Sequence, residues 1–217
     1  ATHIAIVEDI SARKESEEVI KKSEIRFKSL FEDSPFPLWE EDFSEVKNYL
    51  EKLNLINERP ETVSLYFKTH PDVVDKCISL LKIIDVNAMC LKLHKVKTKE
   101  ELIIGLSQFI DEKSISAVIT QLIAITQGEK KLILDTKIKN SKGEYRDINL
   151  RWNVIHGYEK TFERIIVSTE DITDRKSSEN NILKSKQRTE SLINNIDGIV
   201  WECDVKNYNF NFISQKV

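Results

Sequence analysis

The sequence repeats itself with a period of 162 residues. Residues 8–20 read EDISARKESEEVI, and residues 170–182 read EDITDRKSSENNI. The same offset continues without a gap over residues 8–42 and 170–204, where 16 of 35 aligned pairs are identical. Such self-similarity at a fixed period is the signature of a tandem array of structural units. Because the chain has 217 residues, we expect one complete unit between the end of one unit and the start of another.

The unit boundaries follow from where the repeated block falls. The block contains a strand end, a charged helix and the start of another strand, so each junction between units lies within a helix. The predicted organisation is the last strand of a preceding unit at 1–11, a linker helix at 12–33, a complete domain at 34–173 with an insertion at about 44–80, an exit linker helix at 174–196 and the start of a following unit at 197–217.

Composition limits the classes of function. The 33 Lys and Arg residues are balanced by 36 Asp and Glu residues, so a basic nucleic-acid-binding arm is disfavoured. Hydrophobic residues make up 40% of the chain, too many for a disordered tail, yet no apolar run approaches the roughly 18 residues of a membrane helix. The chain has only 5 Gly and 4 Pro, which favours long helices and argues against enzymes with glycine-rich phosphate loops.

Hydrophobic periodicity predicts an α+β fold. Thr98 to Glu101 matches a capping box, Pro71 suits the first position of a helix, and Gly128 suits a helix end. Helices are predicted over 12–33, 44–54, 61–82, the segments after Asn87 and Thr98, 115–127 and 174–196. Strands are predicted over 37–41, 80–86, 131–139, 145–155 and 164–170.

The strand-to-helix exit VSTEDITDRK at 167–176 resembles the end of a PAS domain. Its echo VEDISARK at 7–14 resembles the end of a preceding PAS domain, and DVN at 85–87 and TKEELIIG at 98–105 resemble further parts of the family pattern. The resemblance covers essentially the whole chain. It implies a five-stranded antiparallel sheet with helices packed on one face and a pocket between them.

The complete unit departs from an ordinary PAS domain in one respect. An ordinary member joins its first two strands by a short hairpin, as residues 201–212 look able to do. The complete unit instead inserts about 35 residues between the WEEDFS start at 39–44 and its second strand. With His70-Pro71 in the insertion and Leu-Arg-Trp at 150–152, it resembles a PAS subtype found in multi-PAS sensor histidine kinases.

The candidate pocket residues are Trp39, which stands in the cluster Trp39-Glu40-Glu41-Asp42, together with Cys90, Arg151 and Trp152. Because side chains alternate along a strand, Arg151 and Trp152 face opposite sides, so at most one of them points into a pocket. In the alternative interpretation both tryptophans are core aromatics, and Arg151 pairs with an acidic neighbour on the open face of the sheet.

The junction between the last strand and the exit helix is the candidate signal-relay site. Its residues are Glu170, Asp171, Thr173 and Arg175. Thr173 or Asp171 could cap the helix by accepting its free N–H groups, and Asp171 could also pair with a basic residue. A purely structural cap would use the same contacts as a relay.

No metal site is expected, because no His lies three or four positions from another His or Cys. The chain's histidines are His3, His70, His94 and His156. The PAS resemblance also allows two cofactors to be tested. Residues 105–113 lack the reactive Cys that covalent flavin attachment requires, and residues 111–128 lack the His that would ligate haem iron. Both cofactors are therefore disfavoured. A small organic ligand, or none, remains.

The resemblance implies a non-enzymatic sensor and relay domain in a sensor histidine kinase, with neighbouring PAS units and a downstream kinase domain in the same chain. The alternatives are a ligand-free structural or dimerisation spacer and the PAS region of a diguanylate cyclase. The linker helices carry sparse apolar seams, which predict a weak homodimer. Three widely spaced cysteines indicate a reducing cytoplasmic location, with any membrane association made through other segments of the parent protein.

Overall fold

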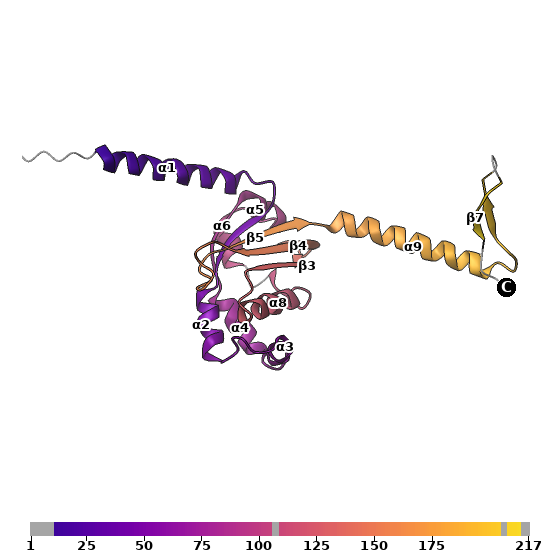
Figure 1. The fold of residues 1–217 in the computed structure, drawn as a ribbon, viewed down its shortest axis with the longest axis horizontal. Coiled ribbons are helices and arrows are strands. Elements are labelled where there is room, and N and C mark those ends of the chain that lie inside the picture. Colours follow the sequence, from indigo (N-terminus) through magenta and orange to yellow (C-terminus); the bar gives the residue numbers. More distant parts are fainter. Residues whose placement is uncertain (1–10, 106–108, 205–207, 214–217) are drawn as a thin grey trace, which may run out of the picture. The chain divides into compact units, whose positions relative to one another are not determined.

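The computed structural model describes residues 11–105, 109–204 and 208–213. They form two compact units that divide after Asp171. The strand predicted at 1–11 falls almost entirely outside the described residues. The helices of the first unit are α1 (Ser11–Glu32), α2 (Ser44–Lys52), α3 (Pro60–Thr69), α4 (Pro71–Leu80), α5 (Ala88–His94), α6 (Lys99–Ile104) and α8 (Ile115–Thr126) (Figure 1). Its strands are β1 (Leu38–Asp42), β2 (Lys82–Val86), β3 (Lys131–Lys139), β4 (Tyr145–Val154) and β5 (Ile165–Asp171).

The five strands form one antiparallel sheet in the order β2-β1-β5-β4-β3. Trp39 of β1 lies opposite Val167 of β5, which lies opposite Trp152 of β4. The first strand is therefore a central strand, although the fifth strand pairs with it only after more than a hundred intervening residues. The predicted α+β fold with a five-stranded antiparallel sheet is confirmed.

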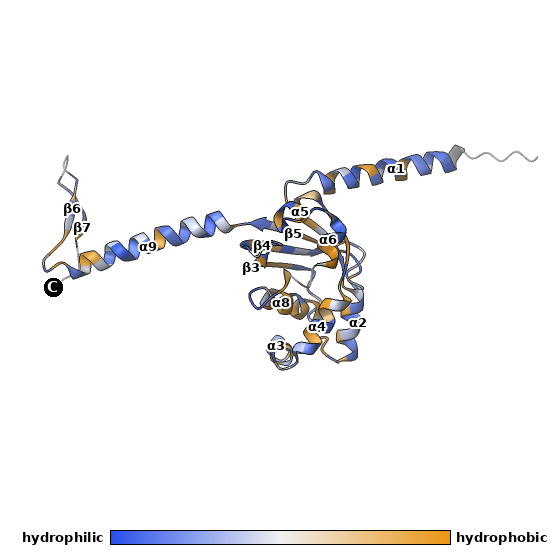
Figure 2. Cartoon of the chain, turned by 180° about the vertical axis from the view of Figure 1, so that it is seen from behind, coloured by the Kyte–Doolittle hydropathy of each residue, from blue (hydrophilic) through white to orange (hydrophobic). Residues whose placement is uncertain are grey.

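The two faces of the sheet differ in polarity. Along β4, Ile148, Leu150 and Trp152 are buried, whereas Arg151 and Asn153 are exposed. This period of two is that of a half-buried antiparallel strand, as the alternation predicted. In both Figure 1 and Figure 2, α2, α3, α4 and α8 lie together on one side of the sheet, and hydrophobic residues colour α4 and α8.

The insertion between β1 and β2 is part of the core. Its side chains Val46, Leu50, Val63 and Phe67 are at most 1% exposed. The helix predicted over 61–82 is two helices, because Pro71 at the first position of α4 cannot donate the N–H that would continue α3. An apolar core of this kind makes the insertion a structural layer of the domain.

Local signals fix several helix ends. The Asn87 side chain caps α5 by accepting from Cys90 N at 3.2 Å, and the Thr98 hydroxyl caps α6 by accepting from Glu101 N at 3.1 Å. Gly128, just after α8, has a φ of +67°, which glycine adopts without strain. The predicted capping by Thr98 and the predicted glycine end are confirmed.

The second unit contains α9 (Thr173–Asn195), β6 (Trp201–Cys203) and β7 (Phe210–Ile213). The two strands form the antiparallel hairpin that residues 201–212 predicted. Helices α1 and α9 begin and end within one residue of the predicted linker helices. None of the helices in the described part of the chain is both long enough and apolar enough to cross a membrane.

Candidate functional site

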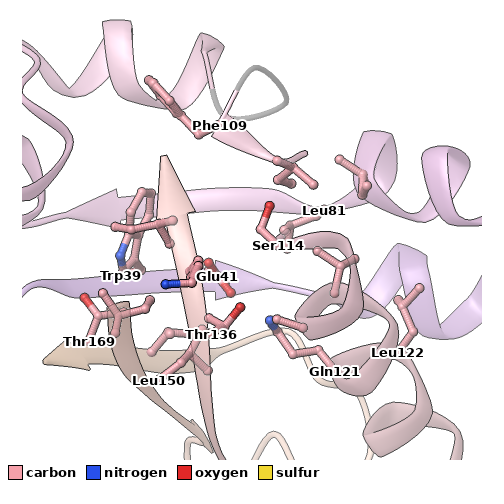
Figure 3. A pocket seen from close by; sticks show the side chains of 18 of the residues that line it. Trp39, Glu41, Leu81, Phe109, Ser114, Gln121, Leu122, Thr136, Leu150 and Thr169 are labelled. Carbon is pink, nitrogen blue, oxygen red and sulfur yellow. The ribbon is translucent and has the colours of Figure 1, made fainter. Parts of the chain in front are cut away.

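A cavity of about 130 Å³ lies between the inner face of the sheet and the helices α4, α5 and α8 (Figure 3). Its walls are mostly apolar, with polar groups at a few positions. The insertion contributes to the wall through Cys77 and Ile78 of α4. The other residues of the cavity wall are Trp39, Glu41, Phe43, Leu81, His94, Phe109, Ile110, Ser114, Ala117, Val118, Gln121, Leu122, Thr136, Lys137, Ile138, Ile148, Leu150, Val167 and Thr169.

Three polar atoms in the cavity wall are buried and lack a hydrogen-bond partner: Thr136 Oγ1, Thr169 Oγ1 and His94 Nδ1. Buried polar groups in proteins are almost always hydrogen-bonded, so each exception calls for an explanation. Here all three belong to the same cavity, where a bound molecule or ordered water can supply the partners.

Glu41 is the fourth polar group without a protein partner. Its side chain lies in the cavity wall on β1 and is 8% exposed. No hydrogen bond or ion pair joins its carboxyl to another residue in the described part of the chain. Burial raises the pKa of this carboxyl to about 8, because the charged form loses its hydration. The cavity therefore contains a carboxyl group that holds its proton at neutral pH.

The neighbouring acidic side chains on β1 do have partners. Glu40, which points to the opposite face, lies 3.2 Å from the guanidinium of Arg164. Asp42 accepts a hydrogen bond of 2.8 Å from the backbone N–H of Ser44. Of three consecutive acids, Glu41 alone is presented to the cavity.

His94 completes the polar set from the helical side. Its ring packs edge-on against Trp39, with centroids 5.3 Å apart, and is tilted against Phe109 at 5.1 Å. Burial lowers the pKa of His94 to about 4. The ring is therefore neutral at neutral pH, with one nitrogen able to accept a hydrogen bond.

Of the four predicted pocket residues, the structure places only Trp39 in the cavity wall. Arg151 lies on the opposite face, where its guanidinium is 3.4 Å from the carboxylate of Glu170. Trp152 faces inward but is fully buried, with its ring 5.9 Å from the rings of Phe43 and Phe162. These placements are those of the alternative interpretation, in which Trp152 is a core aromatic and Arg151 pairs with an acidic neighbour on the open face of the sheet.

Cys90 is also a core residue outside the cavity wall. Its side chain is fully buried, and Sγ donates a hydrogen bond of 3.0 Å to the carbonyl oxygen of Leu38. Burial raises the pKa of this thiol, so it remains protonated. The prediction of Cys90 as a pocket residue is corrected for a geometric reason: the first turn of α5 points the thiol at the β1 backbone.

Sequence reasoning included Glu41 only as a member of the cluster from Trp39 to Asp42 and missed Thr136 and Thr169, although a signal was present. Each is a polar residue on the inward-facing side of a strand that is otherwise apolar at alternate positions. Thr136 interrupts the row of Leu134 and Ile138, and Thr169 follows Val167. A polar residue in an otherwise apolar alternating row indicates a site where the core is not purely apolar.

The junction residues make separate contacts within each unit. Glu170 pairs with Arg151, and Asp171 lies 3.8 Å from the guanidinium of Arg146. The N-cap position of α9 is occupied by Ile172, so neither predicted capping residue holds it. Arg175 lies along α9 at 4.0 Å from Glu179. Only Ile172 separates the end of β5 from the start of α9 in the chain.

The end of α1 is attached to the domain by side chains of α6 and of the residue before α5. Lys99 Nζ lies 2.6 Å from Glu32 of α1 and 2.8 Å from Asp85 of β2. Asn87 Nδ2 donates to the carbonyl oxygens of Phe31 and Phe36. These contacts connect the incoming linker helix with α5 and α6.

Within the described ranges, no three His, Cys, Asp or Glu side chains converge as metal ligands would.

No protein-family model matches the sequence, and no curated protein matches it. The chain is similar, however, to several solved structures. The PAS domain of an HTR-like protein from Haloarcula marismortui is 15% identical over 73% of this chain and 99% of that chain, with a TM-score of 0.45.

Two further similar structures come from signalling kinases. The LOV domain from the Erythrobacter litoralis EL346 blue-light activated histidine kinase is 12% identical over 64% of this chain and 98% of that chain, with a TM-score of 0.43. A domain of a sensory box sensor histidine kinase/response regulator from Geobacter sulfurreducens is 11% identical over 70% of this chain and 96% of that chain, with a TM-score of 0.42.

Proposed function

We propose that the complete unit is a PAS-type sensor domain that binds a small molecule in the cavity and relays the binding event along the chain. One observation carries this proposal. Three buried polar atoms without a hydrogen-bond partner, on His94, Thr136 and Thr169, line the same cavity as the carboxyl of Glu41, for which the described residues supply no hydrogen bond or ion pair. A domain selected only as a spacer has no reason to keep such groups, since each unsatisfied polar group costs about 1 to 3 kcal/mol.

The relay part of the proposal rests on how the chain enters and leaves the domain. Thr169, in the cavity wall, lies on β5, which continues through Ile172 into α9. His94, also in the wall, ends α5, whose N-cap residue Asn87 holds the end of α1. A ligand that changes the position of β5 or α5 thus acts on both linker helices.

The wider context is also a proposal. The PAS resemblance and the 162-residue repeat support an array of sensor units that controls a histidine kinase in the same chain. The apolar side chains exposed along α1, among them Ile20 and Phe27, support a homodimer formed through the linker helices. All three cysteines are free, which is the state expected in a reducing cytoplasm.

The test of ligand binding is native mass spectrometry and thermal unfolding of the purified chain against a panel of small metabolites. Ala117, on the α8 side of the cavity, offers a blocking variant, since Ala117→Leu places three more carbon atoms in the cavity. We expect wild-type protein to carry or acquire a ligand and Ala117→Leu to lose it.

Ile165→Val is the matched control. Ile165 is fully buried but outside the cavity wall, and loss of one methyl group costs about 1 kcal/mol without closing the cavity. Ligand binding should survive in this variant. A wild-type chain that binds no compound of any charge, or an Ala117→Leu variant that binds as well as wild type, overturns the proposed sensing function.

A further inference from the structure

The polar groups of the cavity specify which ligands it can hold. A carboxyl group in an apolar enclosure has two stable states: protonated, or ionised beside a cation. The wall residues that the structure describes provide no such cation. The ammonium of Lys137, whose residue contributes to the wall, pairs with Asp147 at 2.7 Å, and His94 is neutral. The counterion of an ionised Glu41 must therefore come from the ligand.

The hydroxyl groups point to the same chemistry. An ammonium group has three N–H donors and no acceptor. The Glu41 carboxylate together with Thr136 Oγ1 and Thr169 Oγ1 offers three acceptors, and all three side chains lie on the sheet side of the cavity (Figure 3). A ligand carboxylate in the same place could accept a hydrogen bond from protonated Glu41, but it would bring into the enclosure a negative charge that no cation compensates.

The remaining wall and the cavity size limit the rest of the ligand. Phe43, Leu122, Ile148 and Leu150 are apolar and suit a hydrocarbon group. The volume of about 130 Å³ is close to that of an engineered cavity of about 150 Å³ that holds benzene. The ligand is therefore a compact molecule with a branched alkyl chain or a single ring.

The surface beside the cavity has matching charge. A cleft of about 700 Å³ shares Ile78, Leu81 and Ile110 with the cavity wall. The charged residues of its described lining are all acidic: Asp75, Asp111 and Glu112. Asp111 accepts a hydrogen bond from the Tyr145 hydroxyl, which lowers its pKa and keeps it ionised. An acidic cleft raises the local concentration of cations and lowers that of anions.

We infer that the cavity takes a small primary amine whose ammonium group ion-pairs with Glu41 and whose apolar part contacts the aromatic and aliphatic walls. This inference rests on the proposed sensing function and adds the chemical class of the ligand. On binding near neutral pH, the proton held by Glu41 passes to the solvent, and the ligand's charge replaces it.

The test compares three probes of similar length and shape but different charge: isopentylamine, isopentyl alcohol and isovalerate. Binding is measured by isothermal titration calorimetry on the full chain. We expect the amine to bind at least about tenfold more tightly than the alcohol, and isovalerate to bind least, because a hydrogen bond to a charged group is worth more than one between neutral groups. At pH 7 the amine should release about one proton, seen as a buffer-dependent heat.

The decisive variant is Glu41→Gln, which keeps the shape of the side chain and removes its charge. It should weaken amine binding at least about tenfold, leave the alcohol within about threefold and abolish proton release. Glu40→Gln is the matched control, since it removes a neighbouring buried acid that faces away from the cavity. It should bind all three probes as wild type does.

Thr136→Val and Thr169→Val provide independent variants, because each removes a hydroxyl group with little change of shape. Each should weaken the amine more than the alcohol. Binding of the alcohol or isovalerate in preference to the amine overturns the amine class and leaves the sensing function intact. Absence of binding by every probe and every metabolite overturns the sensing function itself, and with it this inference.

Discussion

The side-chain amide of Asn87 donates a hydrogen bond of 3.0 Å to the backbone carbonyl of Phe31, in the last turn of α1. The same side chain donates to Phe36 O at 2.9 Å and accepts from the N–H groups of Leu38 and Cys90. Asn87 is fully buried, and all four of its hydrogen-bonding positions are used. It holds the end of the linker helix, the start of β1 and the start of α5 together.

Replacing Asn87 by alanine should therefore be strongly destabilising. Asn87→Ala removes a side-chain partner from four backbone groups and leaves the Phe31 carbonyl and the Leu38 N–H without that contact, so we expect the free energy of unfolding to fall by about 3 kcal/mol. Urea denaturation of the purified chain measures this. Asn149→Ala, which removes an amide from the open face of the sheet, should cost less than about 1 kcal/mol. Equal effects of the two substitutions would show that Asn87 does not organise this corner.

Glu41 and His94 give the domain an unusual pH dependence of stability. Folded Glu41 keeps its proton up to about pH 8, whereas in the unfolded chain it ionises near 4.5. Stability therefore falls as the pH rises through this interval. Folded His94 stays neutral down to about pH 4, whereas the unfolded side chain gains a proton below 6.5. This contribution is lost as the pH falls from 6.5 to about 4.

Below pH 6.5 the contributions of Glu41 and His94 change the free energy of unfolding in opposite directions. Above pH 6.5 His94 is neutral in both the folded and the unfolded chain, so only Glu41 contributes. We expect the free energy of unfolding to decrease by about 2 kcal/mol between pH 6.5 and 8, at about 1.4 kcal/mol per pH unit. Glu41→Gln should be flat over this range, and Glu40→Gln should follow wild type. Chemical denaturation at a series of pH values measures the profile, and a flat wild-type profile would contradict the protonation state assigned to Glu41.

Lys99 should matter for the linker helix more than for global stability. Its ion pairs with Glu32 and Asp85 are partly exposed, so Lys99→Met should change the free energy of unfolding by less than about 1 kcal/mol. Amide hydrogen exchange in residues 29–32 should nevertheless become faster, because the side-chain contact that holds this turn is lost. Lys22→Met, which removes only an exposed pair with Glu18, is the control and should leave exchange there unchanged.

Two tryptophans on the same face of the sheet should respond differently to substitution by phenylalanine. Trp39 lines the cavity, whereas Trp152 lies in the core between Phe43 and Phe162. Trp39→Phe should alter ligand affinity. Trp152→Phe should lower the stability of the domain and leave ligand affinity unchanged. Truncation by Trp152→Ala should cost about 3 to 5 kcal/mol. Thermal unfolding and calorimetry together separate these effects, and a change of affinity in Trp152→Phe would mean that the cavity extends further than its walls show.

The exposed seam of α1 predicts self-association. Ile20 and Phe27 lie seven positions apart and are more than half exposed, as knobs at one edge of a two-stranded coiled coil would be. We expect analytical ultracentrifugation to show a dimer that dissociates in the micromolar range. Ile20→Ser with Phe27→Ser should give a monomer, while Lys21→Ser with Lys28→Ser should leave the dimer in place. A monomer at all concentrations would contradict association through this helix.

The regular elements of the domain could be predicted from the sequence because their signals are local. Apolar spacing placed α1, α9 and the strand pair β3 and β4 to within one or two residues, and Asn87, Thr98 and Gly128 marked helix ends. The helical segment predicted over 61–82 is divided at Pro71, which was expected to occupy the first position of a helix. These features depend on neighbours within one turn of the chain.

The candidate site could be predicted only in part. Trp39 was identified, but Arg151, Trp152 and Cys90 were placed in the pocket because alternation says which residues share a face and not which face encloses a cavity. Glu41 was named only within the cluster from Trp39 to Asp42, because the three acids of this run look equivalent in the sequence. Its isolation depends on Arg164, more than a hundred positions away, which neutralises Glu40 on the other side of the sheet.

The repeat shows the same division between local and tertiary information. Trp39-Glu40 and Trp201-Glu202 occupy equivalent positions of the two copies, and both lie in a strand. Trp39 is 5% exposed and Trp201 is 59% exposed. The sequence by itself determined that each forms part of a strand, because strand formation follows local pattern. Only the tertiary structure decided that Trp39 lines a cavity with Glu41, because burial depends on strands and helices that arrive from distant parts of the chain.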